Sequence, residues 1–228
     1  AHMSDTQRPV SGFINVNKAQ GVSSAREVAI IKRLTNLSCG HLGTLDPMAS
    51  GVLPVAVGNA TRLFEYFLTK RKRYVAEFTF GIDTDTLDTT GEVIKSGGKV
   101  PRQEEIEAAL PYLTGELMQV PPNYSAKSVN GVRGYKLARE GKQFSLPPKK
   151  VSVGEFKLLC RVSERVFRFE IECGGGTYIR SLGRDLAALL GTYAAMNALC
   201  RTMSGDFKIE NSVETRLLTR DNIFGSLI

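Results

Sequence analysis

Residues 40–53 read GHLGTLDPMASGVL, and this stretch carries the strongest structural signal in the chain. Gly40, Gly43 and Gly51 admit backbone angles that are closed to other residues, and the proline after Asp46 excludes that residue from the helical region. The carboxylate therefore stands in a constrained turn. Because Asp before Pro is also an ordinary turn former, the local pattern alone favours a structural role over catalysis.

Length and composition describe one folded chain. Its 228 residues, 42% of them hydrophobic, suffice for one good core or for a catalytic domain with a small appendage. No apolar run approaches the roughly 18 residues of a membrane span, and the first four residues, AHMS, resemble a tag remnant more than a signal peptide. We expect a cytoplasmic protein without membrane contact, and a monomer by default.

The residues that usually hold metals and cofactors are scarce. Apart from His2 in the presumed tag, the chain has one histidine, His41, and its four cysteines form no C-x-x-C pair. Residues 83–88, DTDTLD, resemble the start of a calcium loop, but the required glycine and glutamate are misplaced, so a solvated loop is the better interpretation. No nucleotide-binding glycine motif is present. We expect no metal, no cofactor and reduced, mostly buried cysteines.

Basic charge is concentrated in two places. Residues 127–150 contain seven basic residues against Glu140 alone, and so hold most of the net charge of +7. Residues 70–73, KRKR, end directly at Tyr74, where an aromatic ring could stack on a base beside cations that meet phosphates. On composition alone, RNA binding and a solvated basic loop are about equally compatible with these segments.

Apolar periodicity predicts a mixture of helices and strands. Strand patterns occupy residues 12–16, 74–80 and 166–173, and an exposed helix is predicted over 102–113. Helical patterns occupy 23–34, where Ser23 or Ser24 can cap the helix, and 177–190, where the buried face is expected to carry Ile179, Leu182, Leu186 and Leu189. In 166–173, the residues Phe167, Phe169 and Ile171 alternate with charged ones, as expected of a sheet with one wet face. Strands and helices do not alternate regularly, which favours an α+β fold with a mainly antiparallel sheet and flanking helices.

The glycine-rich stretch resembles the active-site signature G-H-x-G-T-L-D-P-x-A-[ST]-G-V-L of TruB-type tRNA pseudouridine synthases. Further segments similar to that family follow in the same order: KRY at 72–74, GIDTDTLDTTG at 81–91, PPNYSA at 121–126 and GGTYIRSLGRDL at 175–186. The resemblance extends from about Gly12 to Phe207. It implies the pseudouridine synthase fold, with an active-site cleft across the middle of the sheet.

The resemblance implies isomerisation of a uridine in the T-loop of tRNA, position 55. The C1′–N1 bond breaks, the uracil turns and C1′ joins C5, without cofactor or metal, on a base flipped out of the RNA. The implied partner is the T-arm of tRNA, and no protein partner is required. Two alternatives stay open: a guide-RNA-dependent synthase of the related group, and an RNA-binding or tRNA-folding protein in which modification is secondary.

The resemblance also assigns the catalytic residues. Asp46 matches the catalytic aspartate, which acts at the ribose as a nucleophile on C1′ or as a base that removes a ribose proton. Arg180 matches the arginine that pairs with this aspartate and favours its charged form. Tyr74 matches the tyrosine that stacks on the target base and assists proton removal at C5.

Five further residues are candidates for binding the substrate. His41 matches the histidine that approaches the rearranged T-loop, and Tyr178 and Leu199 are weaker pocket candidates, core packing being the alternative for Leu199. Lys18 resembles the lysine of a K-P-x-G motif, although alanine here replaces the proline. Lys127 begins the basic segment that resembles the region closing over RNA.

The expected domain organisation follows from the same matches. Residues 1–8 are interpreted as a tag remnant and disordered N-terminus, 9–210 as the catalytic domain, and 127–150 as a basic RNA-binding insertion within it. Full bacterial members carry a small C-terminal RNA-binding module. Residues 211–228 are too short to form it and are interpreted as a stub, the module being truncated or naturally absent.

Overall fold

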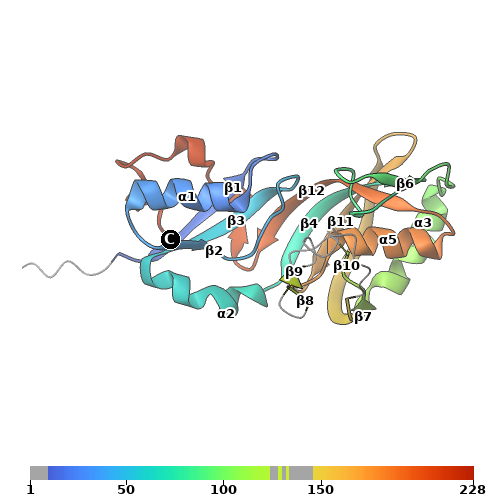
Figure 1. The fold of residues 1–228 in the computed structure, drawn as a ribbon, viewed down its shortest axis with the longest axis horizontal. Helices are drawn as coiled ribbons and strands as arrows, with labels where there is room; N and C mark the ends of the chain where they lie inside the picture. Colours follow the sequence, from blue (N-terminus) through green and yellow to red (C-terminus); the bar gives the residue numbers. More distant parts are fainter. Residues whose placement is uncertain (1–9, 124–127, 130–131, 134–145) are drawn as a thin grey trace, which may run out of the picture. The chain divides into compact units, whose positions relative to one another are not determined.

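The computed structural model describes residues 10–123, 128–129, 132–133 and 146–228. The presumed tag remnant at 1–8 and most of the basic insertion lie outside the described residues. The chain divides into two compact units, residues 1–70 with 201–228 and residues 71–200 (Figure 1). Strand β12 (Ala194–Ser204) begins in the second unit and ends in the first.

The first unit is built on strand β3 (Ser50–Val57). Strand β1 (Gly12–Lys18) pairs with β3 antiparallel, from Gly12 opposite Val57 to Lys18 opposite Gly51. The short strand β2 (Cys39–His41) also pairs antiparallel with β3, at the C-terminal end of β3 from Val55 to Val57. Every residue of β3 from Gly51 onward is buried, as expected of a strand covered on both faces. Strand β13 (Phe207–Lys208) pairs with the end of β12.

Helix α1 (Ser24–Thr35) runs along β1 (Figure 1). It begins where Ser23 Oγ accepts a hydrogen bond from the Arg26 amide, and it ends at Asn36 in the left-handed conformation. The helix buries Val28 and Ile31. The 3₁₀ helix η1 (Gly58–Leu63) and helix α2 (Phe64–Leu68) follow β3, and Phe67 of α2 packs edge-on against Phe13 of β1.

The C-terminal segment packs against β1. The amide of Val213 donates to Asn15 O at 2.9 Å, and Asn17 N donates to Val213 O at 2.8 Å. The final residue, Ile228, exchanges backbone hydrogen bonds with Phe13. Three 3₁₀ helices lie in this segment: η3 (Ile209–Asn211), η4 (Thr215–Leu217) and η5 (Ile223–Ser226).

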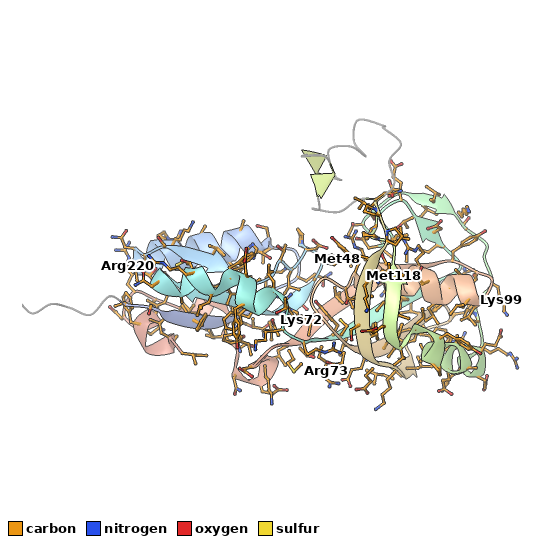
Figure 2. All side chains as sticks on the ribbon, turned by 90° about the horizontal axis from the view of Figure 1, so that it is seen from below. Met48, Lys72, Arg73, Lys99, Met118 and Arg220 are labelled. Atoms are coloured by element: carbon orange, nitrogen blue, oxygen red, sulfur yellow. The ribbon has the colours of Figure 1, made fainter. Side chains whose placement is uncertain are left out.

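The second unit contains a sheet in the order β4-β11-β10-β7, antiparallel throughout. Its strands are β4 (Lys72–Phe80), β7 (Gly115–Gln119), β10 (Lys149–Arg161) and β11 (Val166–Cys173). One face is apolar, and ion pairs cover the other: Arg73, labelled in Figure 2, contacts Glu155 and Glu170, while Arg168 contacts Glu77. The predicted wet face of residues 166–173 is confirmed.

Helix α5 (Ile179–Leu189) packs on the apolar face. Gly183 lets it approach closely, because a Cβ at that position would lie 2.3 Å from a ring carbon of Phe78. Leu182 and Leu186 are buried as expected, but Leu189 is 54% exposed, so its predicted place on the buried face is wrong. Leu189 is the last residue of the helix, where the buried side has already turned away from the sheet.

The exposed helix predicted over 102–113 needs correction. Helix α3 (Gln103–Ala109) ends early and continues as the 3₁₀ helix η2 (Leu110–Leu113), because Pro111 has no amide hydrogen for the α-helical ladder. It also has a buried side, which includes Ile106 and Leu110. Two small two-stranded sheets complete the described structure: β5 (Asp83–Thr84) with β6 (Val93–Lys95), and β8 (Ser128–Val129) with β9 (Val132–Arg133).

The α+β fold with a mainly antiparallel sheet is confirmed. The other predicted elements begin and end within two residues of the observed ones, a margin that is normal for helix and strand ends. Among the described residues, no helix is both long and apolar enough to cross a membrane. The cleft expected across the middle of the sheet stays a prediction.

Candidate active site

The loop that carries Asp46 joins β2 to β3 in the first unit. Ser24, the first residue of α1, holds it through its hydroxyl, which donates to Leu45 O at 2.7 Å and accepts from Leu45 N at 3.0 Å. The side chains of Leu42 and Leu45 are buried, whereas Asp46 is half-buried. The loop is thus anchored directly before Asp46, and Asp46 itself stays partly accessible.

Lys18, the last residue of β1, supports the same loop through hydrogen bonds. Its side chain is fully buried, and its Nζ donates to Ala19 O at 2.9 Å, Val22 O at 2.7 Å and Pro47 O at 3.4 Å. The Gly21 amide adds a hydrogen bond to Pro47 O at 2.7 Å. Burial lowers the pKa of Lys18, while the nearby Glu27 and Asp46 oppose that shift. An ammonium so enclosed fits loop support better than direct RNA contact.

Arg201, at the end of β12, holds the other side of the loop. Its guanidinium donates to Gly43 O at 2.9 Å and to Val52 O at 2.8 Å, and the residue is 2% exposed. At Gly51 the backbone has φ +103°, and a Cβ would lie 2.2 Å from Arg201 O. Only glycine fits this contact, which explains one of the three glycines of the signature.

His41 lies at the end of β2, at the start of the loop. Its Nδ1 atom is buried and has no hydrogen-bond partner among the described residues. Burial lowers the pKa of the imidazole, and the positive charge of Arg201 lowers it further. Both effects favour the neutral imidazole at physiological pH.

Tyr74 and Arg180 belong to the second unit. Tyr74 is a buried residue of β4, opposite Ile171 of β11. Arg180 lies in the first turn of α5, where its Nη1 donates to Thr86 O at 2.9 Å and lies 3.7 Å from Asp88 Oδ2. Asp88 is 6% exposed, so the prediction of a solvated loop over residues 83–88 is wrong at this position.

Tyr178 is the N-cap residue of α5 and is fixed by its backbone. The Gln119 side chain brackets it, accepting from Tyr178 N at 2.9 Å and donating to Tyr178 O at 3.1 Å. Both Tyr178 and Leu199, on β12, are half-buried. Gln119 thus orients the start of the helix that carries Arg180.

The basic segments behave differently from a free cationic surface. Arg71 forms a two-pronged ion pair with Glu172 at 2.5 and 2.8 Å, and Lys72 is 5% exposed. Lys127 lies outside the described residues. At the end of the basic segment, Lys150 contacts Glu116 at 3.1 Å.

The structure groups the candidates by unit. Asp46, His41 and Lys18 belong to the first unit, in or next to the signature loop. Tyr74, Arg180, Tyr178 and Leu199 belong to the second. The pairing of Asp46 with Arg180 stays a prediction. Three residues that sequence reasoning missed are Asp88, Gln119 and Arg201. Asp88 lies in a segment already singled out by the resemblance, but nothing in the local sequence around Gln119 or Arg201 signals their contacts.

The described residues contain no cluster of three or more potential metal-ligating side chains. The four cysteines are free, and two of them, Cys39 and Cys173, are buried. Cys160 is exposed, so the expectation of mostly buried cysteines holds for half of them. Burial raises the pKa of Cys39, which disfavours the thiolate that a nucleophile needs.

Comparison with known proteins gives a consistent family. The model described as "TruB family pseudouridylate synthase (N terminal domain)" matches residues 32–179. "tRNA pseudouridine synthase B" of Bartonella quintana is 43% identical over 201 residues, covering 88% of this chain and 74% of that protein. The protein of the same name from Wolbachia is 39% identical over 215 residues, covering 93% of the chain but 61% of the relative. The chain thus spans less than two thirds of the Wolbachia protein's length.

Solved structures agree on the fold. The structure titled "Crystal Structure of a Cbf5-Nop10-Gar1 Complex" contains a chain that is 32% identical, with a TM-score of 0.71 over 93% of this chain and 54% of that one. The structure of an "H/ACA RNP bound to a substrate RNA containing 2'-deoxyuridine" gives 29% identity and a TM-score of 0.68. By sequence and fold together, the chain belongs to the TruB family of pseudouridylate synthases.

Proposed function

We propose that this chain converts a uridine in the T-loop of tRNA to pseudouridine, in the cytoplasm, as a monomer and without a protein partner. The observation that carries the proposal is the intact signature loop: Ser24, Lys18 and Arg201 clamp it from separate elements and leave Asp46 partly accessible. The two named relatives support tRNA as the substrate, since each is called a tRNA pseudouridine synthase B.

Asp46 supplies the carboxylate that works on the ribose. The reaction is an isomerisation: C1′–N1 breaks, the uracil rotates, C1′–C5 forms, and the proton on C5 passes to solvent while N1 gains one. A carboxylate serves either as the nucleophile on C1′ or as the base for a ribose proton. Both routes need a carboxylate held in a fixed position, and the hydrogen bonds of the clamped loop support that requirement.

Other residues handle the base and the RNA. A base in a folded loop has to leave its stack before reaction. Tyr74 stacks on the uracil, and Arg180 pairs with Asp46. The neutral His41 imidazole stacks on or hydrogen bonds to the RNA in the space that the flipped base vacates. Tyr178, Leu199 and Lys127 contribute further binding. Lys18 acts through the loop, because its ammonium already donates hydrogen bonds to three backbone carbonyls.

Release of label from unmodified tRNA carrying tritium at uridine C5 tests the proposal. The purified chain alone should release label, and Asp46→Asn should lower the rate by at least about 10³-fold while retaining RNA binding. Asp221→Asn, an exposed carboxylate of the C-terminal segment, is the matched control and should leave the rate unchanged. Full activity in Asp46→Asn would contradict the assignment.

A guide-RNA-dependent synthase is the second candidate, because the similar solved chain comes from a complex of Cbf5 with Nop10 and Gar1. This candidate requires label release only after partner proteins and a guide RNA are added. Activity of the purified chain on bare tRNA separates the two. Light scattering of the active preparation tests whether the active species is a monomer.

The catalytic domain is proposed to extend over residues 9–210, with 127–150 as an RNA-binding insertion. Relatives continue beyond the region that this chain matches, since it covers 61% of the Wolbachia protein. We therefore expect this chain to retain catalysis and to bind tRNA more weakly than a longer relative. A KM equal to that of the longer protein would contradict this expectation.

A further inference from the structure

A glycine-rich turn, residues 174–177, joins β11 to α5 in the second unit (Figure 1). The Gly174 amide donates to Ser152 O at 2.8 Å, and the Thr177 hydroxyl donates to Gly174 O at 2.8 Å. Gly176 has φ +83°, a backbone conformation that favours glycine. These bonds and this angle define the shape of the turn.

Three successive amides of this turn donate no hydrogen bond within the described part of the chain: those of Gly175, Gly176 and Thr177. The amides on either side, those of Gly174 and Tyr178, both have acceptors. Gly176 is exposed and its two neighbours are half-buried, so solvent reaches the turn. Successive free amides in a turn form a concave group of donors that binds anions.

Lys149, the first residue of β10, adds a positive charge beside these amides. Its Nζ lies so close to Gly176 that a Cβ on that residue would overlap it. The residue is exposed, and its ammonium has no carboxylate or hydrogen-bond partner among the described residues. Lys149 can therefore bind an anion without first giving up an ion pair.

Arg71 borders the other end of the turn. Its Nη1 lies 3.4 Å from the place that a Cβ on Gly174 would take, and it donates to Ser152 Oγ at 3.1 Å. The Nε and Nη2 atoms are bonded to Glu172 at 2.5 and 2.8 Å, so the charge of Arg71 is largely compensated. Arg71 thus supports the turn, and Lys149 supplies the uncompensated charge.

The turn directly precedes residues that the family resemblance assigns to the site. Tyr178 is the N-cap of α5, and Arg180 lies in the first turn of that helix. Lys149 lies opposite Gln119 in the pairing of β10 with β7, and the Gln119 side chain brackets Tyr178. An anion bound at residues 174–177 would therefore adjoin the start of α5.

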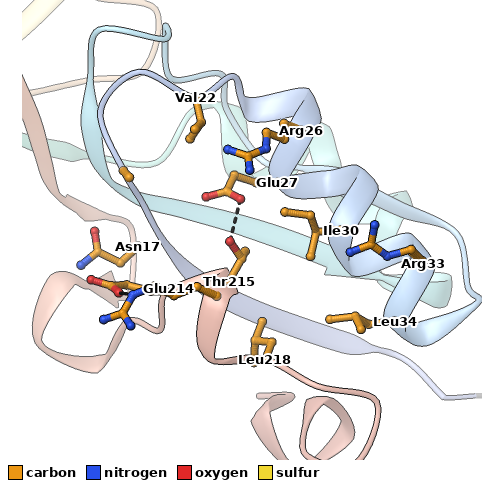
Figure 3. A pocket seen from close by; sticks show the side chains of 12 residues that line it. Asn17, Val22, Arg26, Glu27, Ile30, Arg33, Leu34, Glu214, Thr215 and Leu218 are labelled. Carbon is orange, nitrogen blue, oxygen red and sulfur yellow. Dashed lines mark hydrogen bonds and ion pairs between the residues drawn. The ribbon is translucent and has the colours of Figure 1, made fainter.

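The cavity between α1 and the C-terminal segment, about 540 Å³ in volume, has a different lining (Figure 3). Basic and acidic side chains share it: Arg26, Glu27, Arg33 and Glu214. Glu27 also accepts a hydrogen bond from Thr215 Oγ1 at 2.8 Å, drawn as the dashed line in Figure 3. Because its charges are mixed, this cavity does not favour a polyanion, whereas the turn before α5 offers free donors beside an uncompensated cation.

We propose that residues 174–177 and Lys149 bind one backbone phosphate of the substrate RNA, close to the nucleotide that reacts. The three free amides donate to the nonbridging oxygens, and the Lys149 ammonium supplies the opposite charge. Phosphate contacts fix position without reading bases, so this contact sets the register of the RNA against α5. The choice of RNA as the anion rests on the proposed function.

The first test is the salt dependence with which the full chain binds an unmodified T-arm stem-loop RNA, measured by fluorescence anisotropy. Lys149→Gln should weaken binding roughly fivefold and reduce the slope of log Kd against log salt concentration by about one. Lys149→Arg keeps the charge and should restore most of the affinity. Lys157→Gln, an exposed lysine of the same strand, is the matched control. Equal losses in Lys149→Gln and Lys157→Gln would overturn the proposal.

The second test replaces single phosphates of the same RNA by neutral methylphosphonates. In the parent chain, one linkage should cost at least roughly fivefold in affinity. In Lys149→Gln the cost of that linkage should shrink to less than about twofold, because both changes remove the same contact. A cost that is the same in both proteins at every linkage would contradict the contact.

The amide resonances of residues 175–177 in protein labelled with ¹⁵N identify the anion without any turnover. The RNA should shift these three resonances but not that of Gly97, an exposed glycine with φ +71°. A turn that responds to inorganic phosphate but not to the RNA is a free-anion site, which would overturn the proposal. If the RNA shifts these amides but the parent chain releases no label, the phosphate contact stands and the proposed function fails.

Discussion

Arg180 and Asp88 form a buried ion pair in the second unit, with Nη1 3.7 Å from Oδ2 and both side chains less than a tenth exposed. Asp88 is held in turn by Thr90, whose amide and hydroxyl donate to its Oδ1 at 3.0 and 2.5 Å. The Thr86 carbonyl adds a second acceptor for Arg180. The loop of residues 83–91 therefore orients the arginine that the family resemblance assigns to catalysis.

Replacing Asp88 by asparagine keeps its size but leaves Arg180 without this countercharge. We expect the free energy of unfolding to fall by about 3 kcal/mol, since the remaining charge is buried, and kcat to fall at least roughly tenfold as the guanidinium shifts. Urea unfolding and label release measure the two effects. Asp83→Asn in the same loop is the control, and equal effects of the two variants would contradict the prediction.

Gly51→Ala should disrupt the support of the Asp46 loop. Its new Cβ would lie 2.2 Å from Arg201 O at a positive φ, so both strain and a clash arise. We expect a loss of about 3 kcal/mol of stability. Gly21→Ala has a similar φ of +92° but nothing within 4 Å, and should cost only about 1 kcal/mol. Thermal unfolding of the two variants side by side separates the clash from the strain.

Gln119→Met removes the two hydrogen bonds that bracket Tyr178 and keeps the side-chain volume. Two backbone groups then lose their partners, which should cost about 2 kcal/mol of stability. The first turn of α5 should also lose its fixed position, so kcat should fall more than KM rises. Gln103→Met, at an exposed helical position, should change neither quantity. An unchanged kcat in Gln119→Met would contradict this prediction, because the two Gln119 hydrogen bonds to Tyr178 would then not be needed for activity.

Glu105 should contribute to acid stability. Hydrogen bonds from Lys99 and from the Arg102 amide and side chain lower its pKa from 4.5 to about 2. A lowered folded-state pKa stabilises the protein above pH 4.5, and this contribution is lost as the pH falls toward 2. The melting temperature of the parent should therefore exceed that of Glu105→Gln at pH 6 and converge with it near pH 2. A difference that stays constant down to pH 2 would exclude this linkage.

Much of the fold was predictable because it depends on local patterns. The alternation of residues 166–173 predicts β11 with its correct ends and faces. Ser23 or Ser24 was expected to cap α1, and the structure has Ser23 as the cap. The helix predicted over 102–113 is wrong in its second half, where Pro111 has no amide hydrogen for the α-helical ladder. The place of Leu189 depended on how far α5 remains in contact with the sheet, which no local pattern records.

In the candidate site, too, the features that depend on local sequence were predictable and those that depend on distant residues were not. The constrained turn around Asp46 follows from its own glycines and proline, but its supports come from Arg201 and Lys18, distant in sequence. The Lys18 pattern suggested substrate contact, and only the tertiary structure reveals that three carbonyls enclose its ammonium. Contacts between single side chains far apart in the chain leave no repeating pattern in the sequence, so they cannot be predicted from it.

The contact between Gly183 and Phe78 carries a lesson for engineering. Gly183 lies one helical turn after Arg180, so the depth at which α5 rests on the aromatic ring also sets the reach of the guanidinium. Replacing this glycine by alanine, a routine choice for raising melting temperature, would lift the helix and carry Arg180 away with it. Designers seeking a hardier variant should therefore keep this pair unchanged, because it sets the position of the arginine that the family resemblance assigns to catalysis.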